Sequence, residues 1–527
     1  MCGIVVSAYF SGDAVLPDEA VTENYTDLLA GLYEATAARG PDAQNVFKVH
    51  VQSESLPRDS HALNGTNGLC LDLYASELRL RGDLPVVQPH QVGSNVLCWN
   101  GEILPHENDG IKLIEAIEAL SDVRRLPELF GTIEGPGSNV SCIMEEVPTN
   151  HFYCIDLHRL ANSQDSLLAS VNRELPRDTL EIPVGLDEAP AAFHKAIDGL
   201  IYQLDRSVKL QVQNVPHQLS VNGQARVAVL FSGGIDCTIL AFFASQNLPI
   251  EEPIDLLNVA FDNPRKVQAQ SPSATKKKKK KPPIVQAQAP SFNVPDRLTG
   301  LQEVEELRRL CPGRTWNFVE VNVPYEESQI ARVTIERAMA PSNTVMDLSL
   351  AIALWFASRG VGTVRSSPDG PAEAYTSTAR VLLNGLGSDE LLGGYGRHRT
   401  AYTSGGWQAL IDELQLELER IPSRNLGRDD RVISSHGKET RHPFLSLSVV
   451  TFLAGLPVHL KVDPRLELGV GDKILLRLAA RKVGLLEASG RKKKAMQFGS
   501  HSARMEVDGK EKEKRGDLLL QVGAAVT

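Results

Sequence analysis

The segment 226–241, RVAVLFSGGIDCTILA, constrains the fold of this 527-residue chain more than any other stretch. An apolar, β-branched run at 227–231 predicts a buried parallel strand, and a Ser-Gly-Gly loop follows before a helix resumes at Thr238. Glycines let the backbone approach an anion closely, and N–H groups converge there beside the positive end of the helix. Strand, loop and helix in this order therefore predict a phosphate-binding turn.

An aspartate stands at the mouth of this loop. The carboxylate of Asp236 suits a magnesium ion that bridges to the phosphates. A Ser-Gly-Gly tripeptide alone also occurs in ordinary turns between a strand and a helix, and the Walker loop with its Gly-Lys-Ser or Gly-Lys-Thr ending is absent. The SGGID segment instead resembles the pyrophosphate loop of the N-type ATP pyrophosphatases, the group that includes asparagine synthetase.

Composition is typical of a soluble globular protein with two or three domains, since 42% of the residues are apolar and 23% are charged. The net charge of -10 argues against a nucleic-acid surface as the main function. No apolar stretch is long enough to cross a bilayer, and the first residues lack the features of a secretory signal. Seven scattered cysteines without a CxxC pair favour a reduced, cytoplasmic location and no zinc site.

A cysteine follows the initiator methionine in MCGIVVS. Removal of Met1 would give Cys2 a free α-amino group beside its own thiol. An α-amine titrates near about 7.7 to 8 and a thiol near about 8.5, so the amine can accept the thiol proton at neutral pH. Most second-position cysteines have no such role, and the prediction therefore depends on the motifs that follow.

Three segments supply that context. Residues 25–38 place apolar side chains at helical spacing and stop at Arg-Gly-Pro-Asp, while residues 76–82 alternate like a strand. A further strand at 96–103 ends in Asn-Gly-Glu. An asparagine amide and a glycine N–H are the donors that an oxyanion hole requires during amide hydrolysis. Taken singly, Asn-Gly is more often a hairpin turn.

Together with the second-position cysteine, these segments resemble the class II glutaminase domain of amidotransferases. The resemblance implies an N-terminal-nucleophile (α-β-β-α) fold, in which two stacked β-sheets are flanked by helices. It implies that Cys2 is the nucleophile and that Asn100 and Gly101 form the oxyanion hole. Glutamine would be bound through its ammonium and carboxylate groups. The residues in that role would be Arg81, Glu102 and Asp109.

A segment rich in proline and acidic residues, 172–190, predicts the crossing between two domains, 2–188 and 189–527. A helix over 192–212 then leads into the opening strand of the second domain. Residues 254–264 resemble the next strand of a doubly wound parallel sheet, where nucleotides bind at the strand ends. Val259 is a candidate for lining the adenosine.

An insertion at 265–293 interrupts this second domain. It contains six consecutive lysines flanked by proline and serine, so we expect it to be disordered. A nuclear signal and an anionic tether are functional interpretations of the lysines. A tolerated surface insertion is the interpretation that we favour.

The second segment with recognisable chemistry is VLLNGLGSDELLGGYGRHR at 381–399, a predicted strand, glycine-rich loop and helix. Asp389 would lie opposite Asp236 and complete the metal site. A capped helix after a loop explains an Asp-Glu pair equally well. The segment resembles SGEGSDE of the asparagine synthetases, in which the glutamate accepts a proton from incoming ammonia. Leu386 stands at that position here and cannot move a proton.

A lysine near the start of a predicted helix at 469–484 matches the phosphate-binding lysine of the family. Lys473 would act there on the charge of the transferring phosphate, although without the resemblance it would be an ordinary exposed helix residue. The residues that the resemblance assigns to ATP are Leu230, Ser232, Gly233, Gly234, Asp236, Val259, Asn384 and Gly385. Magnesium would be held by Asp236 and Asp389.

Over nearly its whole length the chain resembles the asparagine synthetase family. The resemblance implies that Cys2 releases ammonia from glutamine, that ATP and Mg²⁺ adenylate a carboxylate, aspartate by analogy, and that ammonia displaces AMP. A non-catalytic or regulatory protein with the same fold is a second hypothesis, motivated by Leu386, by Cys237 in place of serine or threonine, and by departures at 139–170. Amidation of a different carboxylate is a third. The oligomeric state is left open.

Overall fold

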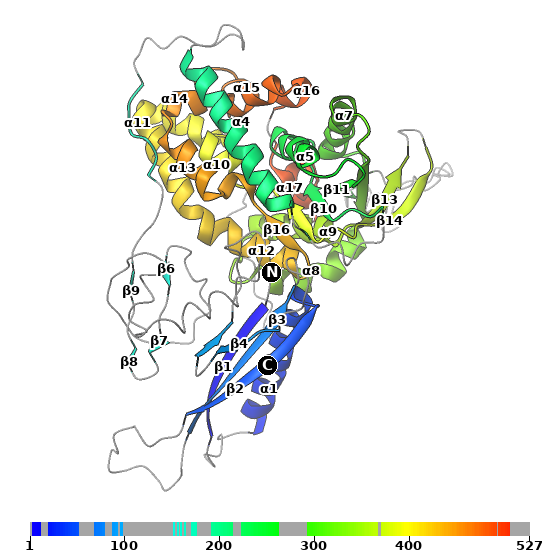
Figure 1. Ribbon diagram of the computed structural model, residues 1–527, viewed down its shortest axis with the longest axis vertical. Helices are drawn as coiled ribbons and strands as arrows, with labels where there is room; N and C mark the ends of the chain where they lie inside the picture. Colours follow the sequence, from blue (N-terminus) through cyan, green and yellow to red (C-terminus); the bar gives the residue numbers. More distant parts are fainter. Residues whose placement is uncertain are drawn as a thin grey trace, which may run out of the picture. The chain divides into compact units, whose positions relative to one another are not determined.

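The computed structural model describes residues 3–11, 19–51, 68–78, 87–92, 95–98, 151–152, 155–156, 159–160, 163–164, 170–176, 191–213, 215, 223–262, 292–366, 370–492 and 494–505 (Figure 1). The chain forms two compact units. The smaller comprises Met1–Ile133, Asn214–Gln218 and Ser434–Glu439, and the larger comprises Glu134–Gln213, Leu219–Ile433 and Thr440–Thr527. The predicted boundary after residue 188 stays a prediction. Nearly all of the predicted disordered insertion, 265–291, lies outside the described residues.

The smaller unit contains a three-stranded antiparallel sheet in the order β1-β3-β2. Its elements are β1 (Gly3–Ser11), α1 (Glu19–Arg39), β2 (Ala43–Val51) and β3 (Gly68–Glu77), with a separate hairpin of β4 (His90–Val92) and β5 (Asn95–Leu97). Helix α1 confirms the helix predicted at 25–38 and packs on β1 and β3, where Tyr33 stacks on Tyr74. The predicted four-layered glutaminase fold stays a prediction, because one three-stranded sheet, one two-stranded hairpin and one helix of this unit are described.

The strand predicted at 76–82 begins much earlier than expected. Strand β3 runs from Gly68 to Glu77, and its end lies opposite the first residues of its two antiparallel partners, because Gly3 pairs with Ser76 and Ala43 pairs with Glu77. The described pairing with the two neighbours together covers residues 68–77. Residues 79–86 lie outside the described part of the chain.

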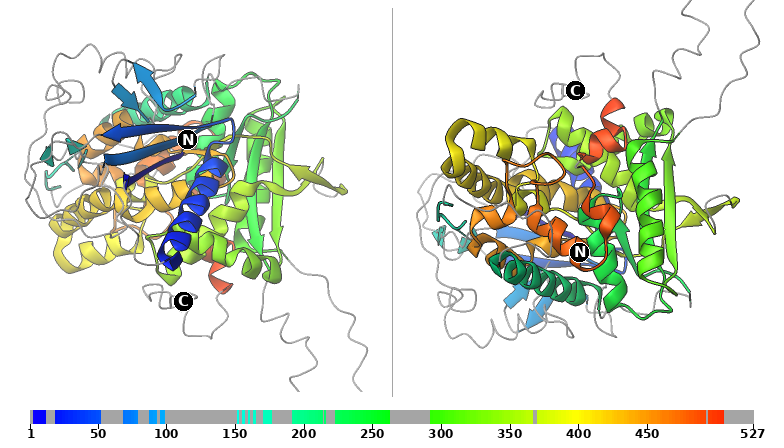
Figure 2. Two further views of the ribbon diagram at one scale, coloured as in Figure 1. Left: turned by 90° about the horizontal axis from the view of Figure 1, so that it is seen from below. Right: turned by 90° about the horizontal axis from the view of Figure 1, so that it is seen from above.

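The larger unit is built on a seven-stranded sheet in the order β14-β13-β12-β11-β10-β15-β16 (Figure 2). The strands are β10 (Val227–Leu230), β11 (Ile254–Phe261), β12 (Trp316–Val323), β13 (Val361–Arg365), β14 (Ala372–Thr376), β15 (Val381–Leu383) and β16 (Glu439–Arg441). The central four, β12-β11-β10-β15, are parallel, which confirms the predicted parallel α/β sheet. The chain leaves β10 toward β11 and later returns to its other side as β15, so the strand order reverses between β10 and β15.

Helices cover both faces of this sheet (Figure 2). Helices α8 (Tyr325–Met339) and α9 (Val345–Arg359) close one core, which contains Val319, Val321 and Val323 of β12. The alternate residues of β12, Phe318 and Glu320, lie on the side of α7 (Pro295–Leu310). Alternation along a strand separates the two faces. On the α7 side, α5 (Ile235–Asn247) packs on β10 and α4 (Ala191–Val212) packs on α5.

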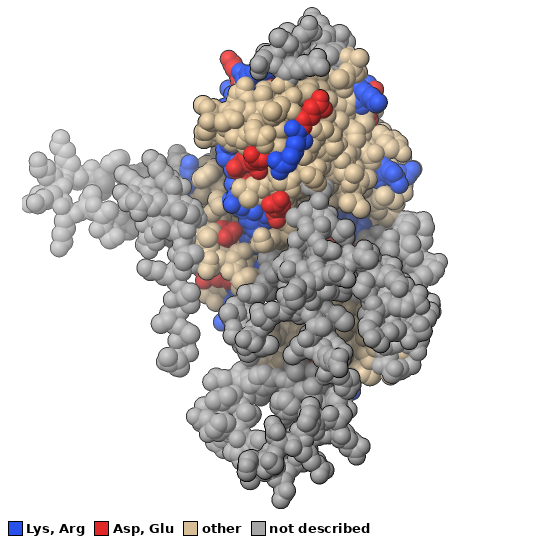
Figure 3. Space-filling model, turned by 90° about the vertical axis from the view of Figure 1, so that its left-hand side faces the viewer, with Lys and Arg blue, Asp and Glu red and all other residues tan. Residues whose placement is uncertain are grey.

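The remaining described elements are short or follow the sheet. They are β6 (His151–Phe152), β7 (Ile155–Asp156), β8 (Arg159–Leu160), β9 (Ser163–Gln164), α10 (Ser388–Leu392), α11 (Gly396–Ile421), the π-helical turn η5 (Pro422–Leu426), α12 (Gly427–Ser434), the 3₁₀ turn η6 (Pro443–Leu445), α13 (Leu447–Gly455), α14 (Val458–Lys461), α15 (Ile474–Lys482), α16 (Leu486–Ser489), α17 (Met496–Gly499) and the 3₁₀ turn η7 (Ser502–Arg504). A search of the described helices for one with the length and hydropathy of a membrane span finds none. On the face drawn in Figure 3, acidic and basic side chains are interspersed over the described surface.

Candidate nucleotide site

The predicted phosphate loop lies at the carboxyl end of β10, beside the point where the strand order reverses. Gly233 has a φ of 76°, and a Cβ there would overlap the backbone of Gly300 in α7, so only glycine fits. Helix α5 begins at Ile235 rather than at the predicted Thr238. The prediction was wrong by three residues because the Thr238 N–H already bonds the Gly234 carbonyl oxygen at 3.1 Å in helical fashion.

The start of α7 holds this loop in place. Thr299 Oγ1 donates to the carbonyl oxygen of Ser232 at 2.9 Å. Asn258 Nδ2, from β11, donates to the carbonyl oxygen of Phe231 at 2.8 Å, and Arg297 Nε donates to Asn258 Oδ1 at 2.7 Å. Sequence reasoning missed these three supporting side chains, although an asparagine inside a buried strand was a usable signal.

A buried lysine joins the two segments that the sequence singled out. Lys473 Nζ lies 2.8 and 2.7 Å from the two carboxylate oxygens of Asp236, 2.7 Å from Asp389 Oδ1 and 3.0 Å from Ser388 Oγ. We call these four residues the lysine cluster. Lys473 is 1% exposed, whereas the Asp236 and Asp389 side chains are 24% and 13% exposed. Ser388 was not predicted.

Backbone geometry explains how the Lys473 ammonium comes so close to both carboxylates. Lys473 precedes α15 with a φ of 53°, in the left-handed region, and this turn brings its side chain to the carboxylates. A Cβ on Gly385 would lie 2.9 Å from the Cβ of Asp236, and one on Gly394 would overlap Asp389 Oδ1. The glycines of NGLGSDELLGG therefore allow close approach of backbone to the lysine cluster.

The two carboxylates face a single cation, so Asp389 does lie opposite Asp236. Carboxylate oxygens are the hard donors that Mg²⁺ prefers, and Mg²⁺ is commonly held by one or two carboxylates while phosphates and waters complete its shell. Within the described ranges, no three His, Cys, Asp or Glu side chains gather into a metal site. The residues present therefore fit magnesium that is bound together with a phosphate ligand.

The other predicted ATP residues lie at the neighbouring strand ends. Leu230 and Val259 are 4% and 5% exposed, and both pack in the core closed by α8 and α9. Asn384 follows β15; its N–H donates to the carbonyl oxygen of Arg441 at 2.9 Å, and its Oδ1 accepts from the Leu386 N–H at 3.1 Å. Their roles in nucleotide binding stay predictions.

A second polar group lies next to the lysine cluster in sequence. Tyr395 Oη donates to Glu390 Oε1 at 2.6 Å, and Asn425 Nδ2 approaches the same oxygen at 3.3 Å. The other carboxylate oxygen of Glu390, Oε2, is buried and has no hydrogen-bond partner among the described residues. Burial and the Glu390 carboxylate raise the pKa of Tyr395, so it stays a donor. Sequence reasoning did not single out this group.

A third group of charges lies between α9 and α12. Arg428 Nη1 is 2.6 Å from Asp347 Oδ1, and its Nη2 and Nε are 2.7 and 2.8 Å from Asp429 Oδ1. We call these three residues the arginine cluster. Burial raises the pKa of Asp429, while the Arg428 guanidinium opposes that rise. These contacts tie two helices together.

The predicted glutaminase residues are not tested. Cys2, Asn100 and Gly101 lie outside the described residues. The same holds for the predicted glutamine-binding residues Arg81, Glu102 and Asp109. Their assignment remains an expectation from sequence.

Comparison with known proteins supplies an independent view of the whole chain. The family model for asparagine synthase matches residues 402–522. Asparagine synthetase domain-containing protein 1 of Bos taurus is 45% identical over 98% of this chain and 97% of its own length. The Mus musculus protein of that name is 40% identical over 66% of this chain, and the match spans 60% of its own length, less than two thirds. Putative asparagine synthetase (glutamine-hydrolyzing) 1 of Methanocaldococcus jannaschii is 39% identical over 16% of each chain. The chain therefore belongs to the family of asparagine synthetase domain-containing protein 1.

Proposed function

We propose that the chain is a glutamine-dependent amidotransferase that uses ATP to convert a carboxylate, aspartate by analogy, to its amide. The observation that carries the proposal is the lysine cluster at the point where the strand order reverses, with one cation between two carboxylates beside a glycine loop. The printed name of the Methanocaldococcus jannaschii relative supports asparagine and glutamine as the product and the ammonia source. In this proposal residues 2–188 release ammonia and residues 189–527 use it.

The first chemical step joins the acceptor to AMP. The glycine loop at 232–234 would bind the phosphates through backbone N–H groups. Asp236 and Asp389 would hold Mg²⁺, which when bound would neutralise phosphate charge. An acceptor carboxylate oxygen attacks the α-phosphorus, and the bond from that phosphorus to the bridging oxygen of pyrophosphate breaks. Lys473 Nζ would stabilise the negative charge that develops on the departing pyrophosphate.

The group around Glu390 supports an amino acid as the acceptor. A buried carboxylate oxygen without a partner is costly, and a ligand ammonium group would satisfy Glu390 Oε2. In the second step ammonia attacks the acyl carbonyl carbon, and the bond to the AMP oxygen breaks. The attacking nitrogen must lose a proton, and Leu386 cannot accept it. Another base must therefore act, or AMP itself must take the proton.

The second candidate is a regulatory protein that keeps the fold, and Leu386 is the observation that favours it. Cys237 weakens that alternative. Its Sγ lies 3.1 Å from the Gly234 carbonyl oxygen, an acceptor that the neighbouring hydroxyl of Thr238 also bonds. Burial raises the pKa of the Cys237 thiol to about 11, so it remains a neutral donor in the first turn of α5. A cysteine at this position therefore keeps the local structure.

One incubation separates these functions. Purified full-length protein would be mixed with glutamine, ATP, Mg²⁺ and aspartate while glutamate, pyrophosphate and asparagine are followed. All three products are expected. Glutamate and pyrophosphate without asparagine would identify a different acceptor. Absence of both, in protein whose N-terminal methionine is removed, would favour the regulatory protein.

A further inference from the structure

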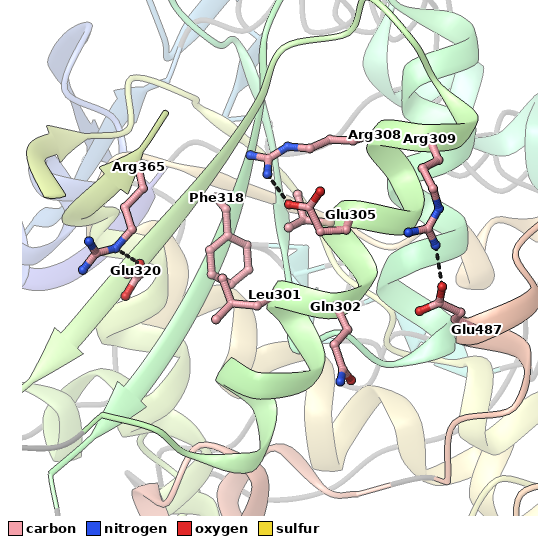
Figure 4. Close-up of a pocket in the computed structure, with 10 residues that line it drawn as sticks. Leu301, Gln302, Glu305, Arg308, Arg309, Phe318, Glu320, Arg365 and Glu487 are labelled. Carbon is pink, nitrogen blue, oxygen red and sulfur yellow. Dashed lines mark hydrogen bonds and ion pairs between the residues drawn. The ribbon is translucent and has the colours of Figure 1, made fainter. Parts of the chain in front are cut away.

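A cavity of about 350 Å³ lies outside the lysine cluster, on the α7 side of the sheet (Figure 4). It is lined by one face of α7, by β12 and β13, and by α16, and it is open to solvent on one side. Its floor is apolar, formed by Leu301, Val304 and Phe318, of which Val304 and Phe318 are almost fully buried. A volume of this size is at the lower end of the range for small-molecule sites.

The charges around this floor do not cancel. Glu320 binds two guanidinium groups, because its Oε2 lies 2.7 Å from buried Arg297 Nη1 and its Oε1 lies 3.0 Å from Arg365 Nε. The other lining arginines, Arg308 and Arg309, each pair with a glutamate of their own (Figure 4). The lining residues alone are balanced, with three arginines and three glutamates. Arg297, buried beneath Glu320 and outside the lining, adds one net positive charge at the β13 end of the cavity.

We propose that this cavity is a second ligand site, which binds a small carboxylate with an apolar or aromatic body. The carboxylate would lie at Arg365, whose side chain is 38% exposed and so remains accessible. The body would cover Leu301 and Phe318, which face the cavity from α7 and β12. A neutral apolar ligand would not neutralise the positive charge at Arg365. A small anion without an apolar group would leave the apolar floor exposed to water.

The same turn of α7 connects this cavity to the phosphate loop. A Cβ on Gly300 would lie 3.0 Å from the Phe318 ring, and Gly300 in turn touches Gly233. Thr299 bonds the carbonyl oxygen of Ser232. A ligand that packs against Phe318 and Leu301 therefore contacts the turn of α7 that positions the phosphate loop. We expect the affinities for this ligand and for ATP to depend on each other reciprocally. This coupling rests on the proposed function, but binding to the cavity does not.

The test uses 4-fluorophenylacetate as the probe and follows its ¹⁹F resonance during titration with the full chain, without nucleotide. We expect saturable binding with a Kd on the order of 1 mM or tighter. Leu301→Trp fills the floor and should weaken binding at least tenfold. Arg365→Gln removes the charge and should weaken it about tenfold, as should replacing the probe by neutral 4-fluorophenylacetamide.

Arg332→Gln is the matched control, because Arg332 also pairs with a glutamate, Glu336, on a surface helix. The Kd of the Arg332→Gln variant for 4-fluorophenylacetate should equal that of the parent chain. The proposal is overturned if no saturable binding occurs, if Leu301→Trp and Arg365→Gln both bind as the parent does, or if the neutral amide binds equally well. Mutual dependence of probe and MgATP affinity is measured separately, so a chain that binds the probe but not ATP would refute the proposed function alone.

Discussion

The lysine cluster and the arginine cluster contain the same charges, one cation and two carboxylates, yet they differ in access and in the freedom of the cation. The carboxylates of the lysine cluster are 24% and 13% exposed, and those of the arginine cluster, Asp347 and Asp429, are 15% and 6% exposed. A guanidinium is held by a planar fork, but an ammonium is a point charge on a flexible stem. We infer that equal charge gives one cluster that can exchange a ligand and one that ties helices together.

The largest expected effect is the loss of pyrophosphate release in Asp236→Asn. The substitution removes one of two carboxylates available to a metal and leaves Lys473 facing an amide, so the rate should fall about 10³-fold or more. Release of pyrophosphate from ATP in the presence of aspartate measures it.

The matched control for that change is Asp347→Asn in the arginine cluster. It should lower the free energy of unfolding by about 1 to 3 kcal/mol and leave pyrophosphate release per folded molecule within about twofold. Equal losses of release in the two variants would erase the distinction between the clusters.

Replacement of the cation comes next. Lys473→Met should slow pyrophosphate release by about 10² to 10³. It should also strengthen Mn²⁺ binding without nucleotide, because the carboxylates lose their internal cation and repel each other. Electron paramagnetic resonance of free Mn²⁺ during titration reports this directly. Unchanged Mn²⁺ affinity would mean that lysine and metal do not share the carboxylates.

The protonation of His398, a buried residue near the lysine cluster, provides a third test. Burial lowers the pKa of His398 to about 4, below its usual value near 6.5. The unfolded chain therefore binds more protons between these values, so the stabilising contribution is present above pH 6.5 and is lost as the pH falls toward 4. His398→Gln should reduce the decline in unfolding free energy over that interval by about 3 kcal/mol. Urea titrations at several pH values measure it, and identical declines would refute the low pKa.

The smallest effect comes from a single methyl group. Gly394→Ala would place its Cβ on Asp389 Oδ1 and should displace that carboxylate, with a cost of about 1 to 3 kcal/mol in stability and a smaller loss of pyrophosphate release than in Asp236→Asn or Lys473→Met. Gly396→Ala, two residues on, meets no atom within 4 Å and serves as the control. Comparable activity in both variants would show that close packing at Gly394 is not required.

Sequence reasoning located the local elements of the larger unit well. Helix α4 begins one residue before its predicted start and ends at its predicted end, and strand β11 begins at the predicted residue 254. These elements depend on apolar periodicity, which is local. Asp236 and Asp389 were also predicted as one metal site from the loops that carry them, and Lys473 was added through the resemblance.

What the sequence did not predict depends on contacts between distant residues. Ser388 and Thr299 matter because the fold brings Lys473 and Ser232 to them, across 85 and 67 positions of the chain. The left-handed backbone at Lys473 has no sequence signature, since lysine rarely adopts it. The predicted glutaminase residues lie outside the described part of the chain.

The most direct test of the nucleotide site is a crystal structure of the full chain with Mg²⁺ and an ATP analogue that resists cleavage between the α and β phosphates. We expect the phosphates beside Gly233 and Gly234, with the metal bound by both Asp236 and Asp389. A nucleotide bound elsewhere, or a metal that contacts neither carboxylate, would contradict the account.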